Sequence, residues 1–215
     1  MAKGDPMDIL SLLQASPARG VVADKPLDHW HELLEEWCMV HERYCRMTFG
    51  DAIFWQSERS NLAALAGAAW RAGWAALEEF SHEKIVKRSK FSGRADLFLR
   101  TPVSEDYIES KLVWCREGSK QRCAWTVKGM RSACDDARAL HLEKRKGIQR
   151  IGVVFVVPSL RKGDRRELSS ALAAFFETVN SVGVDAAAWC FPPIARHLGQ
   201  DGRVYSGVIL LAKKA

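Results

Sequence analysis

Two stretches decide the fold that this sequence predicts: Gly93-Arg94-Ala95-Asp96-Leu97-Phe98-Leu99 and Tyr107-Ile108-Glu109-Ser110-Lys111-Leu112. Each alternates apolar and polar residues, which is typical of a β-strand with one face buried. Between them, Thr101-Pro102-Val103-Ser104 has the residue types that favour a turn. The two stretches therefore predict a β-hairpin.

The expected hairpin brings three charged side chains together. Residues two apart on a strand point to the same face, so Glu109 and Lys111 project together while Ser110 faces the other way. If Asp96 lies opposite Glu109, the midpoint of the hairpin falls between positions 102 and 103, inside the expected turn. The strand pattern and the turn thus predict the same register.

Two carboxylates beside an ammonium have a definite chemical use. Carboxylate oxygens bind hard cations such as Mg²⁺ or Mn²⁺, and a bound cation clamps a phosphate oxygen and acidifies water. Lys111 would orient the attacking water and offset negative charge in the transition state. A cross-strand salt bridge among Asp96, Glu109 and Lys111 is the alternative, and it needs no chemistry.

These residues resemble the bipartite motif of the PD-(D/E)XK nuclease superfamily, over roughly residues 57–158. The resemblance implies a restriction-endonuclease-like α/β fold, with an α-β-β-β-α-β core whose mixed sheet is flanked by helices. It implies that Asp96, Glu109 and the backbone carbonyl of Ser110 bind the metal, and that Lys111 assists the nucleophile. Ala95 stands where the motif has a proline, a residue that does no chemistry there.

A further acid matches the same family. Many members carry a glutamate on the first core helix near the metal, and Glu58 occupies that position in Ser57-Glu58-Arg59-Ser60. The alternative is a first-turn acid that the helix dipole favours. Glu78 and Glu79 lie on the strand expected at 74–80, where side chains alternate between the two faces. Only one of them can therefore approach the site, and Glu79 is preferred.

The remaining periodicity gives the order of elements and two regions, an N-terminal leader and helical extension (1–50) and a nuclease-like domain (51–215). Residues 1–27 are rich in Gly and Pro and predict a loosely held leader with one or two helical turns. The spacing of apolar residues predicts helices over 29–47, 57–73, 120–142 and 164–180. It predicts strands over 74–80, 94–100, 106–114, 150–157, 186–191 and 204–212, with the run 150–157 buried on both faces.

Charge favours a polyanionic partner, because 32 Lys and Arg against 26 Asp and Glu give a net charge of +6. Cations flank the acidic cluster on both sides, before the catalytic strand and along the helix that follows it. Such residues would contact a nucleic-acid backbone, although a solvated basic face explains each run equally well. The expected contacts are Lys84, Lys87, Arg88, Lys90, Arg94, Lys120, Arg122 and Lys128, with Arg116 and Arg131 nearby.

Other features narrow the class of protein. Six Cys without a C-x-x-C pair, and a start without a signal-peptide pattern, indicate a reduced, cytoplasmic protein. No apolar stretch approaches the roughly 20 residues that span a bilayer. The sequence has no Gly-rich phosphate loop and no G-x-S-x-G segment, so neither a nucleotide cofactor nor acyl transfer is expected.

The roles of two tryptophans and of one set of His and Cys residues stay open. Trp114 and Trp125 would either stack on unpaired bases or pack against the core, and packing is preferred. His31, Cys38, His41 and Cys45 lie along one side of the first long helix, where a packed helix face is preferred over a metal site.

The sequence therefore predicts a divalent-metal-dependent nuclease, with DNA endonuclease activity as the leading hypothesis. The alternative is a catalytically inactive protein of the same fold that binds nucleic acid or a partner protein. A homodimer, or assembly through the N-terminal helix into a larger complex, is left open.

Overall fold

The computed structural model describes residues 18–86, 89–116, 122–143, 145–161, 182–195, 197–198 and 202–215. The described strands form one mixed sheet, in the order β1-β6-β9-β5-β4-β3-β2; β8 also pairs with β5, and β7 pairs with β8. The strands are β1 (Arg19–Ala23), β2 (Ala75–Val86), β3 (Ser89–Arg100), β4 (Glu105–Arg116), β5 (Ile148–Arg161), β6 (Ala186–Cys190), β7 (His197–Leu198), β8 (Arg203–Tyr205) and β9 (Val208–Lys214).

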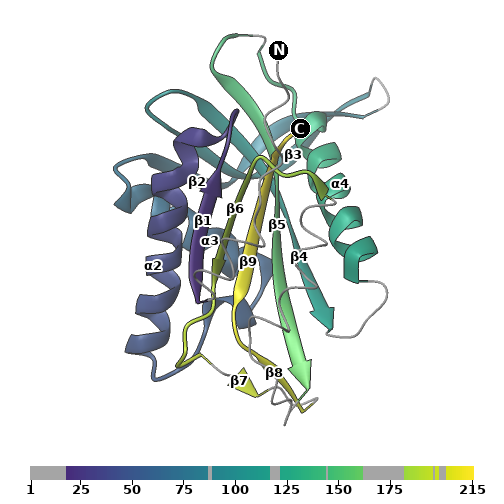
Figure 1. Cartoon of the computed structure of the whole chain (residues 1–215). Coiled ribbons are helices and arrows are strands. Elements are labelled where there is room, and N and C mark those ends of the chain that lie inside the picture. Colours follow the sequence, from purple (N-terminus) through teal and green to yellow (C-terminus); the bar gives the residue numbers. More distant parts are fainter. Residues whose placement is uncertain are drawn as a thin grey trace, which may run out of the picture.

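Helices cover both faces of this sheet (Figure 1). They are α2 (His31–Met47), α3 (Glu58–Arg71) and α4 (Arg122–Ala139), with the short 3-10 helices η1 (Asp28–Trp30) and η2 (Ile53–Trp55). β4 pairs with β5 in parallel, and the other neighbouring strands are antiparallel. The expected α/β class with a mixed sheet flanked by helices is therefore confirmed.

β5 supplies the centre of the core. Ile151, Val153 and Phe155 belong to the large cluster under α2 and α3, whereas Val154 and Val156 belong to the cluster under α4. All five are buried. The prediction that this apolar run is buried on both faces is confirmed, and it makes β5 the strand against which β4 is fixed.

α3 begins and ends where the sequence predicts. The Ser57 hydroxyl accepts the backbone N–H of Ser60 at 3.1 Å, which satisfies a donor that the first turn leaves unpaired. Gly73, with φ +77°, follows the helix in the left-handed conformation that glycine adopts without steric cost. Glu58 is the first residue of α3 and is therefore held at a defined end of the helix.

Two strand boundaries differ from the sequence prediction. The sequence predicts one strand ending at 80 and the next beginning at 94, whereas β2 and β3 continue past these positions and pair from Ala75↔Arg100 to Val86↔Ser89. Opposite charges along this hairpin pair across the strands, as in Lys90–Glu83, so a run of cations does not prevent strand formation. The strand expected at 204–212 is divided into β8 and β9 at Gly207, where an added Cβ would lie 2.1 Å from the ring of Phe191.

The leader also differs from the prediction. Residues 19–23 form β1, the strand at one edge of the sheet, paired with β6. Gly20 is needed there because a Cβ at this position would lie 2.1 Å from the ring of Trp189. Residues 1–17 and the helix expected at 164–180 lie outside the described residues.

The N-terminal extension is attached to β4 by a buried carboxylate. Asp106 has no exposed surface, and its Oδ2 accepts the indole N–H of Trp30 at 2.7 Å and lies 3.2 Å from Nε2 of His29. Leu33, Leu34 and Trp37 of α2 enter the same large apolar cluster as β5. The described part of the extension, residues 18–50, therefore shares one core with β5.

The close approach of α4 to β5 at Gly152 predicts a stability difference between two glycines. A Cβ at Gly152 would lie 2.8 Å from both the backbone N and Sγ of Cys134, so Gly152→Ala should destabilise the fold by about 1–3 kcal/mol. Gly67 in α3 has nothing within 4 Å of such a Cβ, so Gly67→Ala should stabilise by about 0.5–1 kcal/mol. Urea unfolding of both variants measures the difference, and equal stabilities would contradict the packing of α4 on β5.

Candidate active site

β3 and β4 separate beside the two predicted carboxylates. Their ladder runs from Arg100↔Glu105 to Leu97↔Ile108, so Asp96 and Glu109 are the next positions in the expected register but are not paired by backbone hydrogen bonds. Beyond this point β3 stays with β2, and β4 stays with β5, where Glu109 lies opposite Gly152. The sheet therefore forks between β3 and β4 at Asp96 and Glu109.

The backbone of β3 and β2 is distorted at the same place. Ala95 packs in the small cluster with Leu140, whereas Leu97 belongs to the large cluster, so the normal alternation of faces is broken at Asp96. Opposite Asp96 on β2, Glu79 has φ +47°, which is uncommon for a residue with a side chain. Such departures concentrate at functional sites.

Side chains replace the missing ladder partners in the fork. Oδ2 of Asp96 accepts the backbone N–H of Ser110 at 2.8 Å and the Ser110 hydroxyl at 3.2 Å. Glu58 accepts the backbone N–H of Leu112 at 2.8 Å, and its other oxygen lies 3.4 Å from the Ser110 hydroxyl. Ser110 thus joins Asp96 to Glu58 on the α3 side of β4.

Glu109 and Lys111 project from the other side of β4, and each has an ion-pair partner that the sequence analysis missed. Nζ of Lys84, on β2, lies 2.8 Å from Oε1 of Glu109, and Nζ of Lys111 lies 2.7 Å from Oδ2 of Asp136, on α4. The direct salt bridge considered among Asp96, Glu109 and Lys111 is therefore not formed. Local spacing gives no signal for Asp136 or Lys84, because both partners depend on tertiary packing.

The charges of these residues act on one another. Burial raises the pKa of Glu109 to about 7, with Lys84 opposing the rise and the charges of Asp96 and Asp136 adding to it. Burial acts to lower the pKa of Lys111, but the hydrogen bond and charge of Asp136, with further contributions from Glu58 and Asp96, raise it above its ordinary value. Asp96 and Glu58 therefore lie on the α3 side of β4, whereas Glu109 and Lys111 lie on the other side, so the expected cluster on one face is not formed, although the charge of Asp96 acts on both Glu109 and Lys111.

The carboxylate oxygens of Asp96 and Glu109 meet only some of the requirements of a cation site. Oε1 of Glu109 is buried, and the ammonium of Lys84 lies 2.8 Å from it. Both hydrogen bonds to Asp96 are made to Oδ2. Within the described residues, however, no three His, Cys, Asp or Glu side chains form a group that could hold a metal ion.

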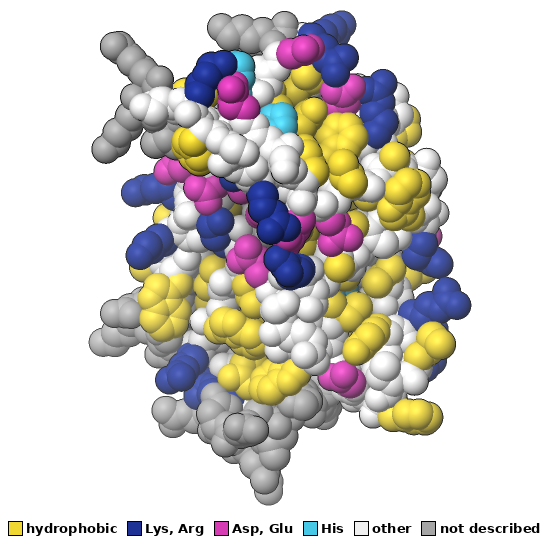
Figure 2. All heavy atoms as spheres, turned by 180° about the vertical axis from the view of Figure 1, so that it is seen from behind, with side chains coloured by type: hydrophobic (Ala, Val, Ile, Leu, Met, Phe, Trp, Pro, Cys, Tyr) yellow, Lys and Arg dark blue, Asp and Glu magenta, His cyan; other side chains and the backbone are white. Residues whose placement is uncertain are grey.

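The expected nucleic-acid contacts have varied surroundings. Lys84 lies in the fork, Lys90 pairs with Glu83, and Arg94 pairs with Glu79, which also pairs with Arg59. Lys128 is exposed on α4 and Arg116 is exposed at the end of β4. Lys87, Arg88, Lys120 and the side chain of Arg122 lie outside the described residues. Figure 2 shows acidic and basic side chains side by side in the middle of the rear face, so this face is not uniformly basic.

The structure also places the His and Cys residues of α2 and the two tryptophans whose roles the sequence left open. His41 is fully buried, with its ring 4.6 Å from that of Trp37, and burial lowers its pKa to about 3. Cys38 and Cys45 are also buried, whereas His31 is exposed, so the packed helix face is confirmed for three of the four residues. Trp114 and Trp125 are both part-exposed, at 39% and 38%.

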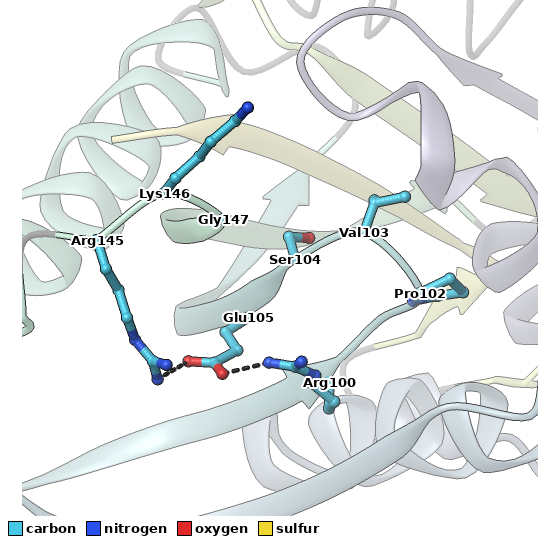
Figure 3. Close-up of a pocket in the computed structure, with 8 residues that line it drawn as sticks. All are labelled: Arg100, Pro102, Val103, Ser104, Glu105, Arg145, Lys146 and Gly147. Atoms are coloured by element: carbon cyan, nitrogen blue, oxygen red, sulfur yellow. Dashed lines mark hydrogen bonds and ion pairs between the residues drawn. The ribbon is translucent and has the colours of Figure 1, made fainter.

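A separate pocket of about 190 Å³ lies at the turn of the β3–β4 hairpin. Arg100 and Arg145 converge there on the carboxylate of Glu105, with Lys146 and Ser104 also in the lining (Figure 3). Because three cations and one carboxylate line it, this pocket carries an excess of positive charge. This pocket was not predicted from the sequence. It lies where β4 begins, at Glu105, six residues before Lys111.

Comparisons of this chain with protein-family models, curated proteins and solved structures found no match. Among the described helices, none has the length and apolar character needed to cross a membrane.

The raised pKa of Glu109 predicts a pH-dependent stability that one variant removes. The carboxyl titrates near 7 in the folded protein against an ordinary value of 4.5, so its ionisation opposes folding as pH rises through this interval. Glu109→Gln should therefore match the wild type below about pH 4 and become more stable than it by about pH 8. Urea unfolding at several pH values measures this, with the exposed Glu32→Gln as control; a constant difference would contradict the buried setting of Glu109.

Proposed function

We propose that this protein is a divalent-metal-dependent nuclease that hydrolyses phosphodiester bonds, with DNA endonuclease activity as the leading form. The observation that carries the proposal is the fork between β3 and β4, around which Asp96, Glu109, Lys111 and Glu58 gather. Two carboxylates and an ammonium at one strand separation match the chemistry of phosphodiester cleavage.

Asp96 and Glu109, with the backbone carbonyl of Ser110, would hold Mg²⁺ or Mn²⁺. When bound, such a cation supplies Lewis acidity at a phosphate oxygen and a more acidic water. The Glu109 carboxylate would take this role in place of its ion pair with Lys84. The bonds from the Ser110 amide and hydroxyl hold the Asp96 carboxylate in place for the same purpose.

Lys111 is the residue that would act on the reacting atoms. Its ammonium, kept charged by Asp136, would orient the attacking water and offset the charge that develops on the phosphate. Glu58 would serve as an accessory acid, fixed to β4 by its bond to the Leu112 amide. The net charge of +6 favours binding of a polyanion, and exposed Lys128 and Arg116 are available to it.

One observation favours the second candidate, a nuclease-fold protein that binds nucleic acid or a partner protein without cleaving. Lys84 already places a cation against Glu109, and the described residues offer no group of three ligands. An internal ammonium in this position would compete with a metal ion. The two candidates differ in whether the protein cleaves in the presence of a divalent cation.

Lys111→Ala is expected to reduce cleavage of supercoiled plasmid in Mg²⁺ or Mn²⁺ by about 10²-fold or more, because a preorganised charge at the transition state is lost. Its affinity for the same DNA should change little, since one of many cations is removed. Gel analysis of nicked and linear products measures the first, and fluorescence anisotropy measures the second.

Lys214→Ala, which removes an exposed lysine at the end of β9, is the matched control and should cleave like the wild type. Equal cleavage by wild type and Lys111→Ala would reject the assignment of Lys111. Binding without cleavage by the wild type in either metal would favour the second candidate.

A further inference from the structure

Three aromatic rings form a cluster next to the fork. Trp114 on β4 meets Trp55 of η2 at 6.1 Å between ring centroids and Tyr205 of β8 at 5.5 Å, with interplanar angles of 90° and 88°. Trp55 and Tyr205 are 4.8 Å apart at 61°. None of the three pairs is stacked in parallel, so Trp114 is held by neighbours that meet it nearly at right angles.

This cluster lies on the same side of β4 as Ser110 and Glu58. Ser110, Leu112 and Trp114 alternate with Lys111 and Val113, and Val113 packs in the cluster under α4. Trp55 precedes Glu58 closely in the chain, and Glu58 binds the Leu112 amide. The aromatic cluster and the accessory acid are therefore attached to the same stretch of β4.

The spacing along β4 suits a nucleic-acid strand. Trp114 follows Ser110, on the same side of β4, by four residues, or about 13 Å at roughly 3.3 Å per residue. That length corresponds to about four stacked nucleotides at roughly 3.4 Å each along one strand. A strand that enters the fork on the side of Asp96 and Glu58 would thus carry a neighbouring base to Trp114.

Trp114 has the exposure and the neighbouring charge that such a base requires. Its side chain is 39% exposed, and its ring is fixed by two others. Arg116, two residues further on the same side of β4, is exposed at the end of the strand. An aromatic ring beside a cation is the arrangement that binds base and backbone of single strands.

We infer that Trp114, supported by Trp55 and Tyr205, is a stacking platform for an unpaired nucleobase, and that the protein acts on single-stranded nucleic acid or on single-stranded segments beside a duplex. A base within a duplex presents only its edges in the grooves, so its face is not available to an indole. This inference rests on the proposed function for its substrate class, but it concerns binding and can be tested without cleavage.

The test measures binding in the Lys111→Ala background without divalent metal. Fluorescence anisotropy is recorded with labelled oligo(dT), oligo(U) and a duplex DNA of the same length. Adding Trp114→Ala should weaken single-strand binding about 5- to 150-fold, the effect of losing one stacked base, and should leave duplex binding nearly unchanged. The dT and U arms show whether the bound strand is DNA or RNA.

Two further variants guard the interpretation. Trp114→Phe retains an aromatic ring and should keep most of the single-strand affinity. Circular dichroism of each variant shows whether it is folded, so that a loss of affinity caused by misfolding is recognised. Trp125→Ala removes an indole of matched exposure, 38%, on α4 and should bind all three probes like the parent. Unchanged single-strand binding by a folded Trp114→Ala, or an equal loss of duplex binding, would overturn the platform. Absence of cleavage by the wild type would reject the proposed nuclease while leaving a Trp114-dependent binding result intact.

Discussion

The bond between the Asp96 carboxylate and the Ser110 amide occupies the point at which β3 leaves β4. A backbone amide that loses its ladder partner in a buried position is costly unless another acceptor replaces the carbonyl. Asp96 supplies that acceptor at 2.8 Å, and Glu58 does the same for the Leu112 amide. The amides of Ser110 and Leu112 therefore keep acceptors where the strands separate, and the carboxylates of Asp96 and Glu58 are held there by the backbone of β4.

The charged groups around this point are distributed so that opposite signs alternate. Lys84 faces Glu109 and Asp136 faces Lys111, each from an element that packs against β4 or β3. Partly buried charges persist only when paired, and these pairs keep Glu109 and Lys111 in place. The ion pairs and the proposed chemistry use the same side chains, and the burial of Glu109 has a cost that appears in its pKa of about 7.

The sequence predicted the hairpin register because the turn and the alternation constrained it independently. The register placed Asp96 beside Glu109 along the strands, and the Ser57 cap placed Glu58 at the start of α3. The bond of Asp96 to Ser110, on the other side of β4 from Glu109 and Lys111, was not predicted. Asp136 and Lys84 could not be predicted, since an ion pair between elements depends on how α4 and β2 pack.

The errors along the chain also have physical causes. β1 was missed because five residues in a stretch rich in Gly and Pro carry little strand signal, and its Gly20 is explained only by the ring of Trp189. The length of the β2–β3 hairpin was missed because charges that pair across strands look, along a single chain, like a basic loop.

The buried carboxylate of Asp106 constrains how this sequence can vary. Replacing Asp106 by an apolar residue would leave the indole N–H of Trp30 without its acceptor, and losing Trp30 would leave a buried carboxylate with fewer donors. Substitutions at the two positions should therefore be tolerated jointly more often than singly. In related sequences, the residues at positions 30 and 106 are therefore expected to covary, which links the evolution of the N-terminal segment to that of the β3–β4 hairpin.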